Sequence, residues 1–471
     1  MSLSHTRSDD PCFVRGLNWL GDAIMSLPAI DALIAAGLSL KIVARPGSAE
    51  IYRNRPEVLE VINETKGLAG RLAAVSALYK ENFGRGLILP NSFSSALVPF
   101  LARVPNRVGF ARNLRSLMLS KAVPVRRRDL AAHQSFYFLK LVEAMGIPAP
   151  FTRPLVLPPP VPEPELPEGF RLALAPGAAF GSAKRWPAEK FARTAELILS
   201  RHPGSAVILG GPSEVEAARQ VEEELTGLFN VVNLAGRTTL AEAISVLSRC
   251  HLTVANDSGL MHLSGALDVP VVAVFGPTNP LTTAPMSRRH ALLRIPVDCA
   301  PCQSRECPKR VRICFEDLTP QMAAEAAERL LAPFQTGNRA IFWTPTQDEA
   351  WPSVPLPRQT SLVIAQSALL AAGHQDLTPP PGTLIIPRPL LENRDHQSIV
   401  KKYDLNPASS FWLGDTPESL TPAVRLGGRT VLLMTDRAQN SLPAWFSQSF
   451  TPDLAAPDPG RAFEWINSLT S

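Results

Sequence analysis

Three segments of the sequence place polar or charged residues between a short apolar run and the start of a helical pattern. In the first, residues 15–22 (RGLNWLGD), Gly16 and Gly21 permit a tight turn and Asp22 falls where a helix is expected to begin. Asp is a favoured N-cap, so Asp22 could serve the helix alone. A carboxylate at this position could also act as a general base, and the two roles can coexist.

The second segment, residues 175–187 (APGAAFGSAKRWP), has small residues followed by Lys184 and Arg185. Such a loop offers backbone N–H groups and the positive end of a helix to a phosphate, and the two side chains add fixed positive charge. The spacing is not that of a Walker A motif, and an ordinary strand-to-helix connection is the alternative.

The third segment is residues 256–262 (NDSGLMH). Asp257 could accept hydrogen bonds from ribose or sugar hydroxyls, while Ser258 and Gly259 present a hydroxyl and an N–H group at a helix start. His262 follows near the end of the first helical turn, where a packed structural role and a ligand contact are both open.

An acidic Asp-x-Asp pair, which could hold a metal ion on a diphosphate, is absent from the sequence. If a nucleotide diphosphate leaves during the reaction, helix N-termini and Lys or Arg side chains must stabilise its charge. The sequence therefore predicts chemistry that requires no cofactor.

Four cysteines form a C-x₂-C-x₄-C-x₆-C pattern at Cys299, Cys302, Cys307 and Cys314. A leading CxxC with two further thiols nearby is typical of a metal site in a reducing compartment, so a structural Zn²⁺ is the first expectation. A redox-labile or metal-free cluster and an iron–sulfur cluster are the alternatives.

Positive charge is concentrated in one stretch, although the whole chain carries only +5. Eight cations fall within residues 103–128, namely Arg103, Arg107, Arg112, Arg115, Lys121, Arg126, Arg127 and Arg128. Such a cluster could face an anionic surface, or it could be a solvated face without a partner.

The 471 residues are too many for a single core, and proline-rich stretches divide them. The longest such stretch, residues 148–167, reads as a stiff extended linker. The resulting blocks are 1–150, 165–335 and 338–471. No uninterrupted apolar run reaches the roughly 18 residues of a membrane-spanning helix. The N-terminus shows no signal peptide, so a cytoplasmic protein is expected.

Short apolar runs alternate with helical patterns in the first two blocks, as in parallel α/β sheets. The expected strands are 12–15, 39–44, 86–89, 171–175, 206–210, 231–234, 252–255 and 271–275, and the expected helices cover 71–79, 133–145 and 187–200 or begin at 22, 213, 239 and 259. Two Rossmann-like domains facing a cleft would bind ligands at the carboxyl ends of their strands, where the three segments lie.

The segment 89–100 (LPNSFSSALVPF), the two loops 176–187 and 256–262, and Phe275-Gly276-Pro277 occur in the order found in a known family. Over about residues 11–335 the chain resembles the ADP-heptose:lipopolysaccharide heptosyltransferases, and the segment 89–100 favours the heptosyltransferase II branch. The resemblance implies the B-type glycosyltransferase fold. It also implies inverting, metal-independent transfer of L-glycero-D-manno-heptose from ADP-heptose to the first heptose of the lipopolysaccharide inner core.

The resemblance also implies roles for individual residues. Asp22 corresponds to the proposed general base of the family, and Lys184, with Arg185 beside it, to the lysine near the donor diphosphate. The donor-binding loop and the acceptor-side segment are expected to contribute Asp257, Ser258, Gly259, His262, Asn91 and Ser92. The implied partners are ADP-heptose, the Kdo/heptose–lipid A inner core and the inner face of the cytoplasmic membrane, touched peripherally, and no nucleic acid.

Two other functions stay open at this point. The acceptor could differ, as for heptosyltransferase I or another family member. The chain could also be a non-catalytic sugar-nucleotide-binding protein, although the presence of Asp22, Lys184 and Asp257 argues against a decayed site.

The last block contains 411–419 (FWLGDTPES) and 423–433 (AVRLGGRTVLL), which are similar to the last third of haloacid dehalogenase-type phosphatases, the nearest of which look like heptose-bisphosphate phosphatases. Such enzymes need two Asp residues after a strand, but residues 344–346 are Thr-Pro-Thr after the expected strand 340–343. Asp415 is present while Ser419 stands, beside Glu418, where a second Asp is expected, and 388–391 lack the expected Lys. The block is therefore expected to fold as a haloacid dehalogenase-like α/β domain without phosphatase activity.

Overall fold

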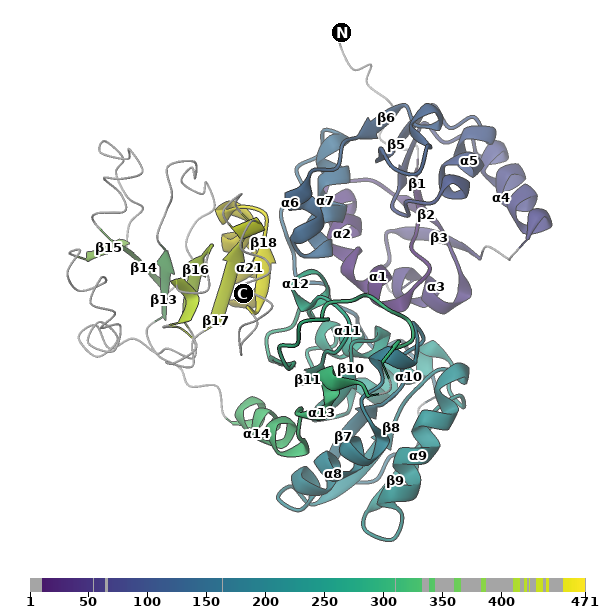
Figure 1. The fold of residues 1–471 in the computed structure, drawn as a ribbon. Coiled ribbons are helices and arrows are strands. Elements are labelled where there is room, and N and C mark those ends of the chain that lie inside the picture. The colour runs from purple at the N-terminus through teal and green to yellow at the C-terminus, as the bar shows by residue number, and fades with distance from the viewer. Residues whose placement is uncertain are drawn as a thin grey trace.

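The computed structural model describes residues 11–332, apart from 54, 64–66, 163 and 310, and shorter stretches of the remainder. These stretches are 339–343, 360–365, 383–386, 410–415, 419–421, 423, 429–434, 438–439 and 452–470. Three six-stranded parallel sheets organise them (Figure 1). We call each sheet with its helices the N-terminal, central and C-terminal unit.

The N-terminal unit has the strand order β3-β2-β1-β4-β5-β6. Its strands are β1 (Cys12–Arg15), β2 (Leu40–Ala44), β3 (Val58–Asn63), β4 (Arg85–Ile88), β5 (Asn106–Phe110) and β6 (Lys121–Val123). Its helices are α1 (Leu20–Met25), α2 (Leu27–Ala35), α3 (Pro46–Arg53), α4 (Leu68–Glu81), α5 (Phe93–Leu101), the 3₁₀ turn η1 (Ser116–Met118), α6 (Arg127–Ala131) and α7 (Gln134–Ala144).

The central unit has the strand order β12-β11-β10-β7-β8-β9. Its strands are β7 (Phe170–Ala175), β8 (Gly204–Ile208), β9 (Asn230–Asn233), β10 (Leu252–Asn256), β11 (Val271–Val274) and β12 (His290–Leu293). Its helices are η2 (Ser182–Lys184), α8 (Ala188–Leu199), η3 (Pro212–Glu214), α9 (Val215–Leu225), α10 (Leu240–Ser248), α11 (Gly259–Ala266), α12 (Pro280–Thr283), α13 (Ile313–Glu316) and α14 (Pro320–Leu331).

The C-terminal unit repeats the same order, β15-β14-β13-β16-β17-β18. Its described elements are β13 (Arg339–Trp343), β14 (Thr360–Ala365), β15 (Thr383–Ile386), β16 (Phe411–Gly414), β17 (Arg429–Leu433), β18 (Leu454–Ala456) and α21 (Pro459–Thr470). The expected strand before residue 344 is confirmed as β13. The Thr344-Pro345-Thr346 triplet, Glu418 and the segment 388–391 lie outside the described residues, so the expected phosphatase-like fold and its missing catalytic residues stay a prediction.

The inner strands are short, mainly apolar runs, and this explains why the sequence pattern found them. Every residue of β1, β10 and β11 is buried, as expected for parallel strands covered on both faces. In register, Val14 pairs with Ile42 and Leu87, and Val254 pairs with Leu174 and Val272. The strand order reverses between β1 and β4 and between β7 and β10, so ligand crevices are expected at these carboxyl ends.

Some expected elements differ in the structure. The single helix expected from Asp22 is two helices that meet at Ser26, because Pro28 lacks the N–H group that a continuous helix would need there. In the first two units the sequence pattern did not predict the strands β3, β5, β6 and β12 or the helices α3, α5, α6, α12, α13 and α14. The stretch 148–167 contains no helix or strand among its described residues, yet it is attached to the central unit. Within it, Val156 N donates to Ala266 O at 2.9 Å and Arg153 pairs with Asp268 at 2.8 Å.

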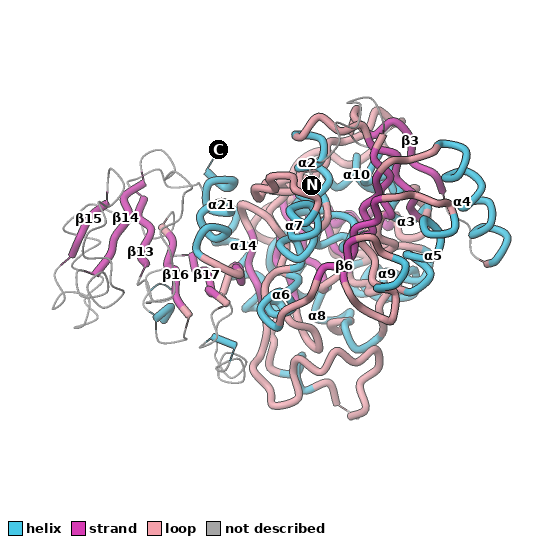
Figure 2. The backbone as a smooth tube through the Cα atoms, turned by 90° about the horizontal axis from the view of Figure 1, so that it is seen from above, coloured by secondary structure: helices cyan, strands magenta, loops and turns pink. Residues whose placement is uncertain are grey.

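The C-terminal unit is docked on the N-terminal unit through α21 and β18. Figure 2 shows α21 between the third sheet and the rest of the molecule. Arg461 of α21 donates to Ala149 O at 2.5 Å and forms ion pairs with Glu464 and Glu143, while Phe151 N donates to Glu464 at 2.9 Å. One apolar cluster contains residues of both units, among them Phe136, Phe151, Phe463, Trp465 and Ile466.

The same C-terminal unit also contacts the central unit. Arg429 donates to Arg288 O at 3.1 Å, and α12 contacts β18. His133, at the N-cap of α7, joins all three units. Its backbone N–H donates to Ala455 O at 2.9 Å, and its Nε2–H donates to Ala284 O at 2.8 Å. The third sheet is therefore attached to both of the others.

Loss of the Arg461 side chain should weaken this attachment. Arg461→Ala leaves the Ala149 carbonyl and the Glu464 carboxylate without a cationic partner in a largely buried site, so we expect a loss of about 2–4 kcal/mol in unfolding free energy. Urea denaturation of the full chain measures it. The control is Arg219→Ala, which removes only solvent-exposed ion pairs on α9 and should change the unfolding free energy far less than Arg461→Ala does. Equal effects would contradict the proposed attachment.

Candidate active site

Asp22 lies in the first turn of α1, at the carboxyl end of β1. Trp19 occupies the N-cap position and makes no side-chain capping hydrogen bond, so the expected N-cap role of Asp22 is wrong. The helix begins two residues before Asp22, which leaves the carboxylate available for another role. Burial raises the pKa of Asp22 to about 6, an effect that Lys184 opposes and Asp257 reinforces. These two partners belong to the central unit, so the site is formed between the two units.

His262 of α11 packs directly on the turn that precedes Asp22. A Cβ atom at Gly21 would lie 2.6 Å from His262 Cδ2, so only glycine allows this approach. His262 is buried, and burial lowers its pKa to about 4, which keeps the ring neutral near pH 7. Its Nδ1 has no hydrogen-bond partner among the described residues. Of the two roles left open for His262, the structure supports packing between α1 and α11.

Lys184 and Asp257 form the charged centre of the central unit's half of the site. Lys184 Nζ lies 2.6 Å from Asp257 Oδ2, and both side chains are largely buried. The ammonium also lies 4.9 Å from the centroid of the Phe180 ring. The pair joins the loops after β7 and β10, two segments that are 73 residues apart in sequence.

Asn256, which we did not single out as a site residue, fixes these two loops to one another. Its Oδ1 accepts from Trp186 N at 3.0 Å, and its Nδ2 donates to Pro176 O at 2.7 Å. The side chain is fully buried. Its position within the NDSG segment was visible in the sequence, but its partners 70 to 80 residues away were not.

Ser258 and Gly259 stand at the start of α11, as predicted. Ser258 is the N-cap, and its buried Oγ has no hydrogen-bond partner in the described part of the chain. A buried hydroxyl without a partner is costly, and an anionic or hydroxylated ligand at this helix end would satisfy it.

The four-cysteine segment braces the loop that carries Lys184. Ala183 N donates to Arg305 O at 3.0 Å, and a Cβ at Gly181 would clash with that carbonyl. Arg312 donates to Ser182 O at 3.1 Å and also to Arg185 O. The position of Lys184 therefore depends on residues about 120 positions later, and sequence reasoning missed Arg305 and Arg312.

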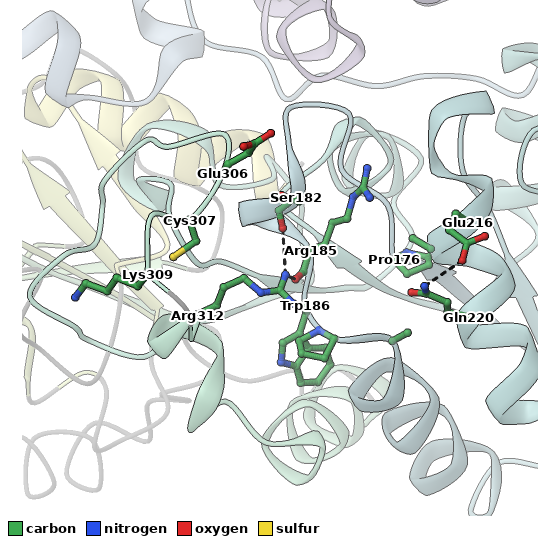
Figure 3. A pocket seen from close by; sticks show the side chains of 13 residues that line it. Pro176, Ser182, Arg185, Trp186, Glu216, Gln220, Glu306, Cys307, Lys309 and Arg312 are labelled. Carbon is green, nitrogen blue, oxygen red and sulfur yellow. Dashed lines mark hydrogen bonds between the residues drawn. The ribbon is translucent and has the colours of Figure 1, made fainter.

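Arg185 lies apart from the Lys184–Asp257 pair. It lines a cleft of about 490 Å³ between the Lys184 loop, α9 and the cysteine segment (Figure 3). Lys309 and Arg312 line it from the cysteine segment, with the Arg312 guanidinium reaching to the backbone of Ser182, and Trp186 lies at the base of the view. Glu214, a further residue that we did not predict, has a pKa raised by burial and lowered in part by Gly211 N and Arg185.

All four cysteines of the predicted zinc site are described and carry free thiols. Cys314 has a pKa raised to about 11, mainly by burial, and Cys299, Cys307 and Cys302 add to this rise, so the thiols lie near one another. Within the described ranges, however, no three His, Cys, Asp or Glu side chains form a group that could hold a metal ion. Structural zinc stays a prediction from the spacing.

Asn91 and Ser92 belong to a second polar group, in the N-terminal unit. Asn91 Nδ2 donates to the Tyr137 hydroxyl at 3.1 Å, and Ser92 is the N-cap of α5. Arg115 lies beneath them and is fully buried, contrary to the expectation that it faces an anionic surface. Its guanidinium donates to Phe110 O and Ser95 Oγ, both at 3.0 Å, and to Pro90 O, so it orders the acceptor-side segment.

The N-terminal and central units match proteins of one known family. The family model of glycosyltransferase family 9 (heptosyltransferase) matches residues 71–311. The chain is 29% identical over 345 residues to lipooligosaccharide heptosyltransferase 2 of Haemophilus influenzae, covering 67% of this chain and 98% of that protein. It is 29% identical over 349 residues to lipopolysaccharide heptosyltransferase 2 of Escherichia coli K12, covering 68% and 97%.

Solved structures agree with these matches. The structure of the E. coli ADP-heptose lps heptosyltransferase II aligns with a TM-score of 0.59 at 27% identity, covering 68% of this chain and 98% of that one. A family 9 glycosyl transferase from Veillonella parvula aligns with a TM-score of 0.57 at 19% identity, which supports the fold alone. The N-terminal and central units thus have the two-domain Rossmann-like architecture expected from the sequence.

The raised pKa of Asp22 has a consequence for stability. The ordinary pKa of 3.8 applies to the unfolded chain, so ionised Asp22 disfavours the folded state above pH 6 and has no such effect below pH 4. Asp22→Asn should therefore raise the unfolding free energy at pH 8 by about 1–3 kcal/mol, and the gain should shrink as pH falls from 6 toward 4. Urea denaturation across this range tests it, with the exposed Asp317→Asn as a control that gains nothing. A pH-independent effect of Asp22→Asn would contradict the assignment.

The zinc prediction is tested by metal analysis of the purified full chain. We expect about one Zn²⁺ per chain, lost in Cys302→Ser together with a lower melting temperature. Cys250→Ser, which changes a buried thiol outside the cluster, should keep the metal. Metal-free protein with undiminished stability would show that the spacing has another cause.

Proposed function

The chain belongs to glycosyltransferase family 9, the heptosyltransferases, and we propose that it transfers L-glycero-D-manno-heptose from ADP-heptose to the first heptose of the lipopolysaccharide inner core. One observation carries the proposal beyond family membership. The buried carboxylate of Asp22 in one unit lies within electrostatic reach of the Lys184–Asp257 pair in the other. A proton acceptor and a diphosphate-binding cation thus flank one crevice between the units.

Asp22 acts as the general base in the proposed mechanism. The acceptor hydroxyl attacks the anomeric carbon of the donor and gives its proton to the Asp22 carboxylate. With a pKa of about 6, Asp22 is mostly ionised at pH 7 and has a greater proton affinity than an exposed Asp. Attack from the face opposite the diphosphate inverts the anomeric centre.

The leaving group takes the electron pair of the broken bond between the anomeric carbon and the diphosphate oxygen. Lys184 and the N-terminus of α11, with the Ser258 hydroxyl, lie where they can stabilise the growing negative charge. These groups supply positive charge for departure of ADP without a required metal ion. Asp257 positions Lys184 and can still accept hydrogen bonds from sugar hydroxyls.

We assign the acceptor to the N-terminal domain, residues 1–150, and the donor to the central domain, residues 165–335. Arg115 and Tyr137 hold Asn91 in the segment expected on the acceptor side. The full-length similarity to heptosyltransferase 2 proteins favours an acceptor that already carries one heptose. A heptosyltransferase I-type acceptor is the alternative.

Two further assignments belong to this proposal. The lipid-anchored acceptor implies a cytoplasmic protein in peripheral contact with the inner face of the cytoplasmic membrane. In the described part of the chain no helix has the length and apolar character needed to cross a bilayer. For residues 338–471 we propose a structural role without phosphatase activity, since α21 and β18 contact both other units.

The test measures ADP release from ADP-heptose with truncated cores of defined length. Release with a core that ends in one heptose supports the proposal, release only with a Kdo-terminated core selects the alternative acceptor, and no release with any core contradicts catalysis.

Asp22→Asn should retain ADP binding while kcat falls roughly 10²–10⁴-fold, because the proton acceptor is lost. The kcat/KM of the unmodified protein should fall below about pH 6, where Asp22 becomes protonated, and the variant should lack this limb. Asp317→Asn is the matched control and should behave as the unmodified protein. Near-native kcat in Asp22→Asn would remove Asp22 from the mechanism.

A further inference from the structure

Two leucines project from the loop between β5 and β6 of the N-terminal unit. Leu114 is 92% exposed and Leu117 is 94% exposed, although large aliphatic side chains are normally at least partly covered. A single exposed leucine needs no explanation, but two that lie three residues apart on one loop, both almost fully in solvent, do.

The loop beneath these leucines is firmly held. Between them, Arg115 is fully buried and donates to Phe110 O and Ser95 Oγ. Met118, directly after Leu117, is also buried. Asn113 Nδ2 donates to Asn91 O at 2.9 Å. The leucines are thus presented on an ordered base, so covering them would cost little backbone entropy.

The end of α5 extends the apolar surface. Phe100 and Leu101 are 43% and 49% exposed. Arg107 connects them to the loop, because its guanidinium lies 5.4 Å from the Phe100 ring centroid and its Nε donates to Met118 O at 2.6 Å. We call Leu114, Leu117, Phe100 and Leu101 the apolar surface of the N-terminal unit.

Positive charge lies beside this apolar surface. From residue 82 to residue 128 the sequence contains no Asp or Glu, whereas it contains nine Lys and Arg residues. Of these, Arg103 next to Leu101, Arg112 in the loop and Lys121 at the start of β6 are exposed close to the apolar surface. Arg126, Arg127 and Arg128 are also exposed but stand at α6, which contacts α12. Helix α5 lies on the side of the unit away from the third sheet, so the C-terminal unit does not cover the end of α5 (Figure 1).

We propose that this apolar surface docks on an anionic lipid bilayer, with Leu114 and Leu117 inserted among the acyl chains and the neighbouring cations on the headgroups. Apolar side chains with cations beside them match the layers of a membrane interface. A protein partner would need acidic residues placed opposite these cations, whereas a leaflet of anionic lipids carries negative charge over its whole surface. The inference rests on the proposed function, in which the acceptor is anchored in a membrane. The hydrogen bond from Asn113 to Asn91 O connects this surface to the acceptor-side segment.

Vesicle sedimentation of the full chain tests the docking itself. We expect binding to vesicles of phosphatidylethanolamine with phosphatidylglycerol, weakened by salt, and little binding to pure phosphatidylcholine. Leu114→Asp/Leu117→Asp should reduce binding to the anionic vesicles by at least about tenfold. Leu228→Asp, at a 61% exposed leucine of the central unit, is the matched control and should bind as the unmodified protein. Equal binding by the double variant, or no binding by the unmodified protein, overturns the proposal.

Activity separates a lipid contact from a sugar contact. With a deacylated, water-soluble core the double variant should keep its kcat/KM within about twofold, and with the same core embedded in vesicles it should lose at least about tenfold. An equal loss with both acceptors would assign the leucines to sugar binding or folding and overturn the proposal. If the unmodified protein binds anionic vesicles but transfers heptose to neither acceptor, the proposed function fails while the docking stands.

Discussion

Gly21 and His262 pack so closely that no methyl group fits between them, and this contact determines where the two halves of the active site meet. It brings the first turn of α1 against α11, which places the carboxylate of Asp22 near the amine of Lys184. Each of these residues follows a parallel strand whose carboxyl end faces the other unit. The chemistry therefore depends on an apolar contact between one residue without a side chain and a neutral imidazole.

The sequence was sufficient to find the inner strands and the three loops, because β1, β7 and β10 are mainly apolar. The carboxyl ends of parallel strands lie at one edge of their sheet, so the loops that follow them could be placed there. It was not sufficient where the outcome depends on contacts between distant residues. Arg115 reads as one of eight clustered cations, yet its donors are used on carbonyl groups inside the N-terminal unit. Asp22 reads as a helix cap because a shift of two residues in the helix start has no local signal.

The positive charge of Lys184 is neutralised by Asp257 in the absence of a ligand. Lys184 is already paired with Asp257, so its ammonium is not left as an isolated buried charge. In the proposed reaction, the donor diphosphate would bind to the Lys184 ammonium while Asp257 stays paired with it. Because Lys184 is already ordered by Asp257, binding would cost little further side-chain entropy. The Arg305 and Arg312 contacts keep the loop in place as the diphosphate binds.

Through His133, the C-terminal unit takes part in the contact between the first two units. One residue contacts Ala284 of the central unit through its ring and Ala455 of the C-terminal unit through its backbone, while its own helix belongs to the N-terminal unit. Any change in the relative position of the first two units would therefore alter a contact of the His133 ring or of its backbone. The two-thirds of the chain that aligns with its relatives therefore does not stand alone here. Removal of the C-terminal unit would expose apolar side chains such as Phe136 and Phe151 and would take away the Ala455 carbonyl that accepts from the His133 backbone.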